Sequence, residues 1–223
     1  MSAPVRLLLV ACVAALALAW PAFAKDYPLD EQPMYGGVDL KSGQVQPDKD
    51  ILTACVKLTG GKTFSATVSN ACATLGFQAF FKGDYRRAML FFNNGWALRQ
   101  DNGSTYHGFA LVLIERDKND TEAETMFQKA IASPLVTPGA NMDYGRFLIL
   151  RERYADAIPV LEVGLAKAEY GKEDFQFALI AAHEQLQQYP KACALARQAV
   201  GQLKDDRRAT VQALIDGEHC RGQ

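Results

Sequence analysis

Apolar residues recur at helical spacing along most of this chain, and the pattern repeats about every 35 residues. Four polar turns each lead into an alanine, at Ala88, Ala123, Ala157 and Ala192, at intervals of 35, 34 and 35 residues. Apolar or small residues follow each alanine at offsets of four, seven and eight. These offsets describe one face of a helix with 3.6 residues per turn. Four copies in phase predict four amphipathic helices related by a repeat.

A second helical stretch precedes each polar turn. Small residues recur in it at Gly76, Ala110 and Gly145, at intervals of 34 and 35 residues. A small side chain at such a point lets two helix backbones approach closely, as in a helical hairpin. Each hairpin leaves an apolar side that only the next hairpin can cover. The pattern therefore predicts an all-α protein whose helical hairpins stack into a solenoid.

The order of residues in the first copy resembles the tetratricopeptide repeat (TPR). The residues that carry the resemblance are Leu75-Gly76, Gly83-Asp84-Tyr85, Ala88, Phe92 and Trp96. The resemblance covers residues 69–203 and implies about four TPR-like repeats, with the array over residues 64–204. The copies are degenerate, because Cys72 and Ala79 stand where the family has tryptophan and tyrosine, and the fourth copy has Leu179-Ile180 in place of Leu-Gly.

The two flanks of the array have their own patterns. Residues 25–63 contain scattered prolines and glycines and predict an extended arm with one short helix, which Asp48 would cap. Residues 205–223 predict a capping helix and tail, with Val211 facing inward and Arg207 and Arg208 outward, since terminal repeats need a polar outer face. Pro159 falls inside a predicted helix, where it would remove one backbone donor and bend the helix.

Residues 1–24 have the pattern of a secretory signal peptide. A short basic region ends at Arg6, an almost wholly apolar run spans residues 7–20, and Ala22-Phe23-Ala24 precedes the expected cleavage site before Lys25. The apolar run is shorter than the roughly 20 residues needed to cross a bilayer. Residues 9–12 weakly resemble a lipoprotein box, but the apolar run continues beyond them. We therefore expect the repeat array to be exported to the periplasm or secreted. After the leader is cleaved, we expect no stable insertion into a membrane.

Composition and charge narrow the function classes. The chain of 223 residues is 49% hydrophobic, which is enough for an ordinary core. Its 24 Lys and Arg nearly balance its 25 Asp and Glu, and no block of like charge is present. A phosphate backbone or an anionic lipid surface needs a basic patch, so binding to nucleic acid is not expected.

Cysteine usage fits an exported chain. Four cysteines remain beyond the leader: Cys55, Cys72, Cys193 and Cys220. An even number suggests disulfides, and four cysteines allow three pairings. Proximity in sequence favours Cys55 with Cys72 and Cys193 with Cys220, whereas the alternative is four buried thiols that never pair.

Candidate chemistry is sparse. The three histidines, His107, His183 and His219, lack the spacing of a metal site. His107 and His183 fall on the first helices of copies two and four, where a buried or groove-lining histidine is the ordinary role. We predict no catalytic residue, no metal and no cofactor.

The TPR resemblance implies a concave groove lined by the first helix of each repeat, where a peptide or partner helix docks. Judged by their positions within each repeat, the residues that would line the groove are Phe77, Phe81, His107, Glu115, Arg146, Phe177 and Glu184. The alternative for Phe77, Phe80 and Phe81 is that they join Phe91 and Phe92 in the core. The carboxylate clamp of the family's co-chaperone members is not implied, because Phe77 and Arg146 stand where it needs asparagine.

Three function hypotheses follow. The first is a non-catalytic protein-interaction scaffold of the cell envelope. The second is a self-associating envelope protein, a homo-oligomer whose apolar arm (Tyr27, Pro28, Met34, Tyr35) docks into a neighbour's groove. The third is an enzyme or metal binder that uses His107 or His183.

Overall fold

A computed structural model describes residues 27–134 and 136–221, and every regular element in these ranges is helical. The expected signal peptide, residues 1–24, lies outside the described residues. The α-helices are α1 Lys49–Leu58, α2 Ser65–Phe80, α3 Tyr85–Leu98, α4 Gly103–Val112, α5 Asp120–Ala132, α6 Pro138–Ile149, α7 Tyr154–Lys167, α8 Lys172–Gln185, α9 Tyr189–Ala199 and α10 Asp205–Asp216.

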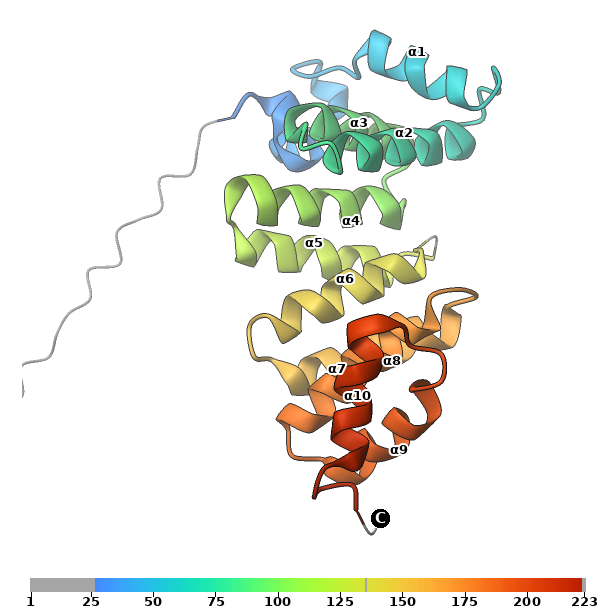
Figure 1. Ribbon diagram of the computed structural model, residues 1–223. Coiled ribbons are helices and arrows are strands. Elements are labelled where there is room, and N and C mark those ends of the chain that lie inside the picture. Colours follow the sequence, from blue (N-terminus) through green and yellow to red (C-terminus); the bar gives the residue numbers. More distant parts are fainter. Residues whose placement is uncertain (1–26, 135, 222–223) are drawn as a thin grey trace, which may run out of the picture.

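Four helical hairpins form the body of the molecule: α2/α3, α4/α5, α6/α7 and α8/α9. They stack one on another into an elongated array, with α1 at one end and α10 toward the other (Figure 1). The first helices of successive hairpins contact each other, α2 with α4 and α6 with α8. The predicted all-α solenoid of helical hairpins is confirmed.

A phenylalanine ring joins the first two hairpins. Phe92 of α3 is fully buried, and its ring lies between Gly76 of α2 and Gly108 of α4. A Cβ atom at Gly76 would come within 2.4 Å of the ring, and one at Gly108 within 2.3 Å. Gly145 of α6 faces Leu161 of α7 in the same way. Two of the three recurring small residues, Gly76 and Gly145, are therefore sites where a large side chain packs directly on a neighbouring backbone, and Gly108 is a further such site.

One hairpin contains an extra residue, and a π-helical turn accommodates it. The first and third hairpins have 12 residues from small residue to alanine, Gly76 to Ala88 and Gly145 to Ala157, but the second has 13, Ala110 to Ala123. Residues Leu113–Asp117, directly after α4, form a π-helical turn. A π turn holds one more residue than an α turn, so both ends of this hairpin keep their register.

Helix α7 runs without interruption through Pro159. Pro159 lies in the second turn, where it has no backbone N–H to donate, and the helix continues to Lys167. The two arginines of the last helix that were predicted to face outward are exposed at Arg208 and partly exposed at Arg207, and both also make contacts with the array. Arg207 pairs with Asp174 of α8, and Arg208 donates to the carbonyl oxygen of Leu203 at 2.8 Å.

The N-terminal arm is not extended as expected but folds against α3. It forms three short 3-10 helices, Leu29–Glu31, Pro33–Gly37 and Leu40–Ser42. The arm buries Tyr35, which is 1% exposed, and this burial raises the pKa of its hydroxyl. The second hypothesis placed Tyr27, Pro28, Met34 and Tyr35 in a neighbour's groove, whereas here this segment packs on its own chain.

Asn93 of α3 holds the arm through its side-chain amide. Its Nδ2 donates to the carbonyl oxygens of Asp30 and Gln32, both at 2.8 Å, and its Oδ1 accepts from the backbone N–H of Tyr35 at 3.3 Å. Arg116 adds a second attachment, because its guanidinium lies over the Tyr27 ring, 3.8 Å from the centroid. One buried amide thus satisfies three backbone groups that an irregular segment cannot pair within itself.

The four cysteines lie in two pairs at disulfide distance. The sulfur atoms of Cys55 and Cys72 are 2.09 Å apart, which ties α1 to α2. Those of Cys193 and Cys220 are 1.93 Å apart, which ties the segment after α10 to α9. Each pair therefore holds one flanking segment to the array.

Replacing Gly108 with alanine tests the packing of Phe92. The added methyl group overlaps the ring, and we expect the free energy of unfolding to fall by about 1–3 kcal/mol, despite the better helix propensity of alanine. Urea denaturation measures the change. Gly201→Ala is the control, because no atom lies within 4 Å of its Cβ position. Equal stability of the two variants would contradict this packing role.

Replacing Asn93 with alanine tests the attachment of the arm. Three backbone groups lose their partner, so we expect a loss of about 1–3 kcal/mol in unfolding free energy and faster amide exchange over residues 29–37. Asn94→Ala is the matched control, because this neighbouring buried amide donates only to Leu90 within its own helix. Exchange that rises equally in both variants would refute the specific role of Asn93.

Candidate functional site

Three consecutive first helices each contribute one side chain to a row across the array. The rings of Phe77 on α2 and His107 on α4 have centroids 5.1 Å apart. His107 Nε2 in turn lies 2.9 Å from the Oδ2 atom of Asp143 on α6. We call the side of α2, α4 and α6 that carries this row the inner wall; α2 packs on α4, and the His107–Asp143 contact links α4 to α6.

His107 joins two hairpins inside this wall. It is 5% exposed, and its ring centroid lies 6.1 Å from that of Phe127 on α5. Its Nδ1 is buried and has no hydrogen-bond partner among the described residues. Asp143 remains about one-third exposed. This arrangement provides a polar link between α4 and α6, with no nucleophile or second ligand beside it among the described contacts.

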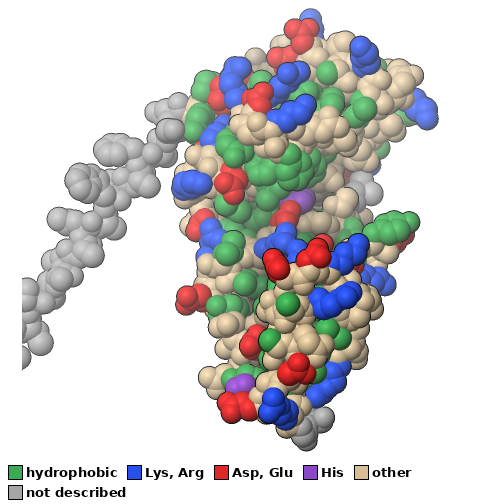
Figure 2. All heavy atoms as spheres, in the orientation of Figure 1, with side chains coloured by type: hydrophobic (Ala, Val, Ile, Leu, Met, Phe, Trp, Pro, Cys, Tyr) green, Lys and Arg blue, Asp and Glu red, His purple; other side chains and the backbone are tan. Residues whose placement is uncertain are grey.

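An apolar strip occupies the same wall. Leu111 follows His107 by four residues on α4 and so shares its helical face, and Ile114 lies just beyond in the π-helical turn; both are half-buried. Phe81, four residues beyond Phe77, is 78% exposed. We call Phe77, Phe81, Leu111 and Ile114 the apolar strip. Hydrophobic side chains gather in a hollowed area between α2 and α4, beside a histidine (Figure 2).

Arg146 provides the exposed charge on this wall. It follows Asp143 by three residues on α6 and therefore lies on the same side of that helix. Its side chain is exposed, and none of the ion pairs formed by the described residues includes it. Leu150, four residues further on, is 80% exposed.

The seven predicted groove residues fall into three groups. Phe77, Phe81, His107 and Arg146 come together on the inner wall. Phe177 and Glu184 of α8 instead line a narrow crevice against α10, whose Thr210, Val211 and Leu214 form the other side. Glu115 lies in the π-helical turn and pairs with Lys118 at 3.8 Å.

Sequence reasoning missed three residues of the wall: Leu111, Ile114 and Asp143. Leu111 could have been found from its offset of four to His107 on one helical face, whereas Ile114 lies in the π-helical turn. Asp143 could not, because its contact depends on how α6 is placed against α4. Phe77 and Phe80 are half-buried and Phe81 is exposed, so these rings are divided between wall and core.

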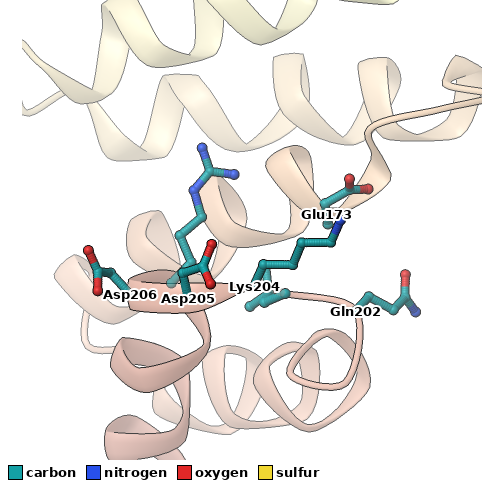
Figure 3. Close-up of a pocket in the computed structure, with 7 residues that line it drawn as sticks. Glu173, Gln202, Lys204, Asp205 and Asp206 are labelled. Atoms are coloured by element: carbon teal, nitrogen blue, oxygen red, sulfur yellow. The ribbon is translucent and has the colours of Figure 1, made fainter.

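One hollow among the described residues lies away from this wall. Its volume is about 350 Å³, and its lining is Glu173, Gln202, Leu203, Lys204, Asp205, Asp206 and Arg207. Lys204 extends across it toward Glu173, while Asp206 and Gln202 lie at opposite ends (Figure 3). Its charges are of mixed sign and point in different directions, so they do not converge on one ligand group.

The remaining histidines make ordinary structural contacts. His183 Nδ1 lies 2.7 Å from Gln188 Oε1, and the His219 ring stacks on Tyr189 with centroids 3.8 Å apart. Within residues 27–134 and 136–221, no three His, Cys, Asp or Glu side chains form a group that could hold a metal ion. No helix in these ranges is long and apolar enough to cross a membrane.

Ion pairs lie at the edge of the array where hairpins meet. Glu124 of α5 accepts from Arg153 Nη1 at 2.7 Å and from the Tyr144 hydroxyl at 3.0 Å. The Arg153 guanidinium is the main reason that the pKa of Glu124 is lowered. Arg151 pairs with Asp120 at the neighbouring turn. These contacts tie α5 to the hairpin α6/α7 and leave the inner wall free of them.

Replacing Asp143 with alanine tests the polar link between α4 and α6. Both ring nitrogens of the buried His107 then lack a protein partner, so we expect unfolding free energy to fall by about 1–3 kcal/mol. Asp143→Asn keeps an acceptor for the ring and should cost less. Thermal or urea denaturation measures both. If alanine and asparagine cost the same, the hydrogen bond does not support the wall.

No protein-family model and no curated protein sequence matches the chain. Solved structures do match. One is the crystal structure of YrrB, described as a TPR protein with an unusual peptide-binding site. The match has a TM-score of 0.54 and 14% sequence identity, and it covers 79% of this chain and 89% of that chain. Together with the stacked hairpins, this likeness shows that the chain has the fold of a tetratricopeptide-repeat array.

Proposed function

We propose that this protein is a non-catalytic scaffold that binds a segment of a partner protein along the inner wall of α2, α4 and α6. The observation that carries the proposal is the apolar strip, which ends in the 78% exposed ring of Phe81. A partner segment that covers the strip gains roughly 25 cal/mol for each Å² of apolar surface removed from water.

The shape of the wall supports binding of a peptide or helix. Adjacent first helices present side chains at regular intervals, and the hollow between them accepts side chains of an extended or helical ligand. A hollow lined with apolar groups is a typical protein-interaction surface. YrrB, whose fold is similar, is described as having a peptide-binding site.

We further propose that the protein works in the cell envelope, in the periplasm or outside the cell. The leader-like residues 1–24 and the two cysteine pairs at disulfide distance support this location. Disulfides persist in oxidising compartments and are rare in the cytosol.

A photo-crosslinking amino acid at position 81 tests the scaffold proposal. The side chain there is exposed, so the substitution should not disturb folding, and irradiation of living cells should join the protein to one partner of defined mass. Glu162 is the control position, because it is exposed on α7, a second helix. The proposal fails if both positions give the same products or neither gives any. A product of twice the chain mass would instead indicate self-association.

A further inference from the structure

The inner wall carries very little charge for a surface that is partly exposed. Helix α2 contains no Asp, Glu, Lys or Arg, and neither does α4. Helix α6 contains one of each sign, Asp143 and Arg146. By contrast, α8, which lies beside the terminal helix, begins Lys-Glu-Asp and ends with a glutamate and a glutamine.

The two charges of α6 are not equivalent. Asp143 accepts the hydrogen bond of His107 within the wall. Arg146 is exposed and takes part in no ion pair of the described residues. Among the described residues, the wall therefore offers one exposed cation outside any ion pair, Arg146, which lies three residues from the partly exposed Asp143 at one end of an apolar surface.

We propose that the inner wall selects an apolar, uncharged segment of a partner protein that carries a single acidic side chain, which pairs with Arg146. This inference rests on the proposed function and adds the chemistry of the partner. A like charge opposite Arg146 is disfavoured, and an unpaired charge over Phe77, Leu111 and Ile114 would lose water without gaining a partner.

The dimensions of the wall set the length of the segment. Three helices about 10 Å apart span about 20 Å between the outer axes. An extended chain advances roughly 3.3 Å per residue, so about six residues cross this distance and about eight also reach over the flanks of the outer helices. Beyond α6 the wall ends at α8, where α10 faces Phe177 and the guanidinium of Arg207 lies 5.5 Å from the centroid of that ring. The acidic residue then lies at the end of the segment that is nearer to α10.

A random octapeptide library displayed on phage tests the proposal. Each octapeptide is joined to the coat protein at its C-terminus, so any carboxylate that is selected belongs to a side chain. Against the disulfide-bonded protein, we expect enrichment of sequences with aliphatic or aromatic residues and one Asp or Glu. Against Arg146→Glu, the acidic residue should be replaced by Lys or Arg in the same register.

The affinity of one selected acidic peptide provides the quantitative check. Because Arg146 is exposed, its replacement leaves the fold intact, and Arg146→Glu should weaken binding by about tenfold or more. Arg87→Glu is the matched control, since Arg87 is an exposed arginine of α3, a second helix, and should leave binding unchanged.

The outcomes separate the two proposals. Enriched peptides that need Phe81 but carry no acidic residue, or that bind Arg146→Glu equally well, overturn the charge inference and leave the scaffold proposal standing. If no peptide is enriched, or if Phe81→Ser leaves every enriched peptide bound, the inner wall is not a binding surface and both proposals fail.

Discussion

The close approach of helix backbones around a few large side chains is the constraint on which this structure depends. Phe92 fills the space between α2 and α4 only because glycines at positions 76 and 108 leave its ring in contact with both backbones. Leu161 uses Gly145 in the same way. The contact of Phe92 with Gly108 holds the first two hairpins close together, whereas Gly76 and Gly145 bring together the two helices of one hairpin. A shift of α4 against α2 would therefore separate the rings of Phe77 and His107.

The fold was predictable because helical packing leaves a periodic signal. Alanines and glycines recur at a nearly fixed interval. Apolar residues four, seven and eight positions after each alanine identify the buried face of each helix. The π-helical turn was visible in principle as one extra residue between Ala110 and Ala123. The arm was not predictable, since Asn93 holds it through backbone groups some 60 residues away. Such bonds depend on local backbone shape and leave no spacing in the sequence.

The groove was predictable only in part, for a related reason. Position within the repeat indicates which residues of a helix point to the inner side, and two of the residues it groups, Phe77 and His107, have their rings in contact. Phase does not reveal what else covers that side. Phe177 and Glu184 have groove-like positions, but α10 lies against them. The same helix turns Arg207 back toward Asp174, because a partner charge on α8 is close to its first turn.

The division of charge between the edge and the wall has a physical basis. Charged pairs such as Arg153 with Glu124 and Arg151 with Asp120 join elements at sites that stay in contact with water. There the pairs cost little desolvation, and each can strengthen the array modestly. When a partner covers a surface, each charged side chain on that surface loses its hydration, which opposes binding. Keeping α2 and α4 free of charged residues avoids that loss, and under the proposed function the exposed guanidinium of Arg146 is the group that distinguishes one apolar segment from another.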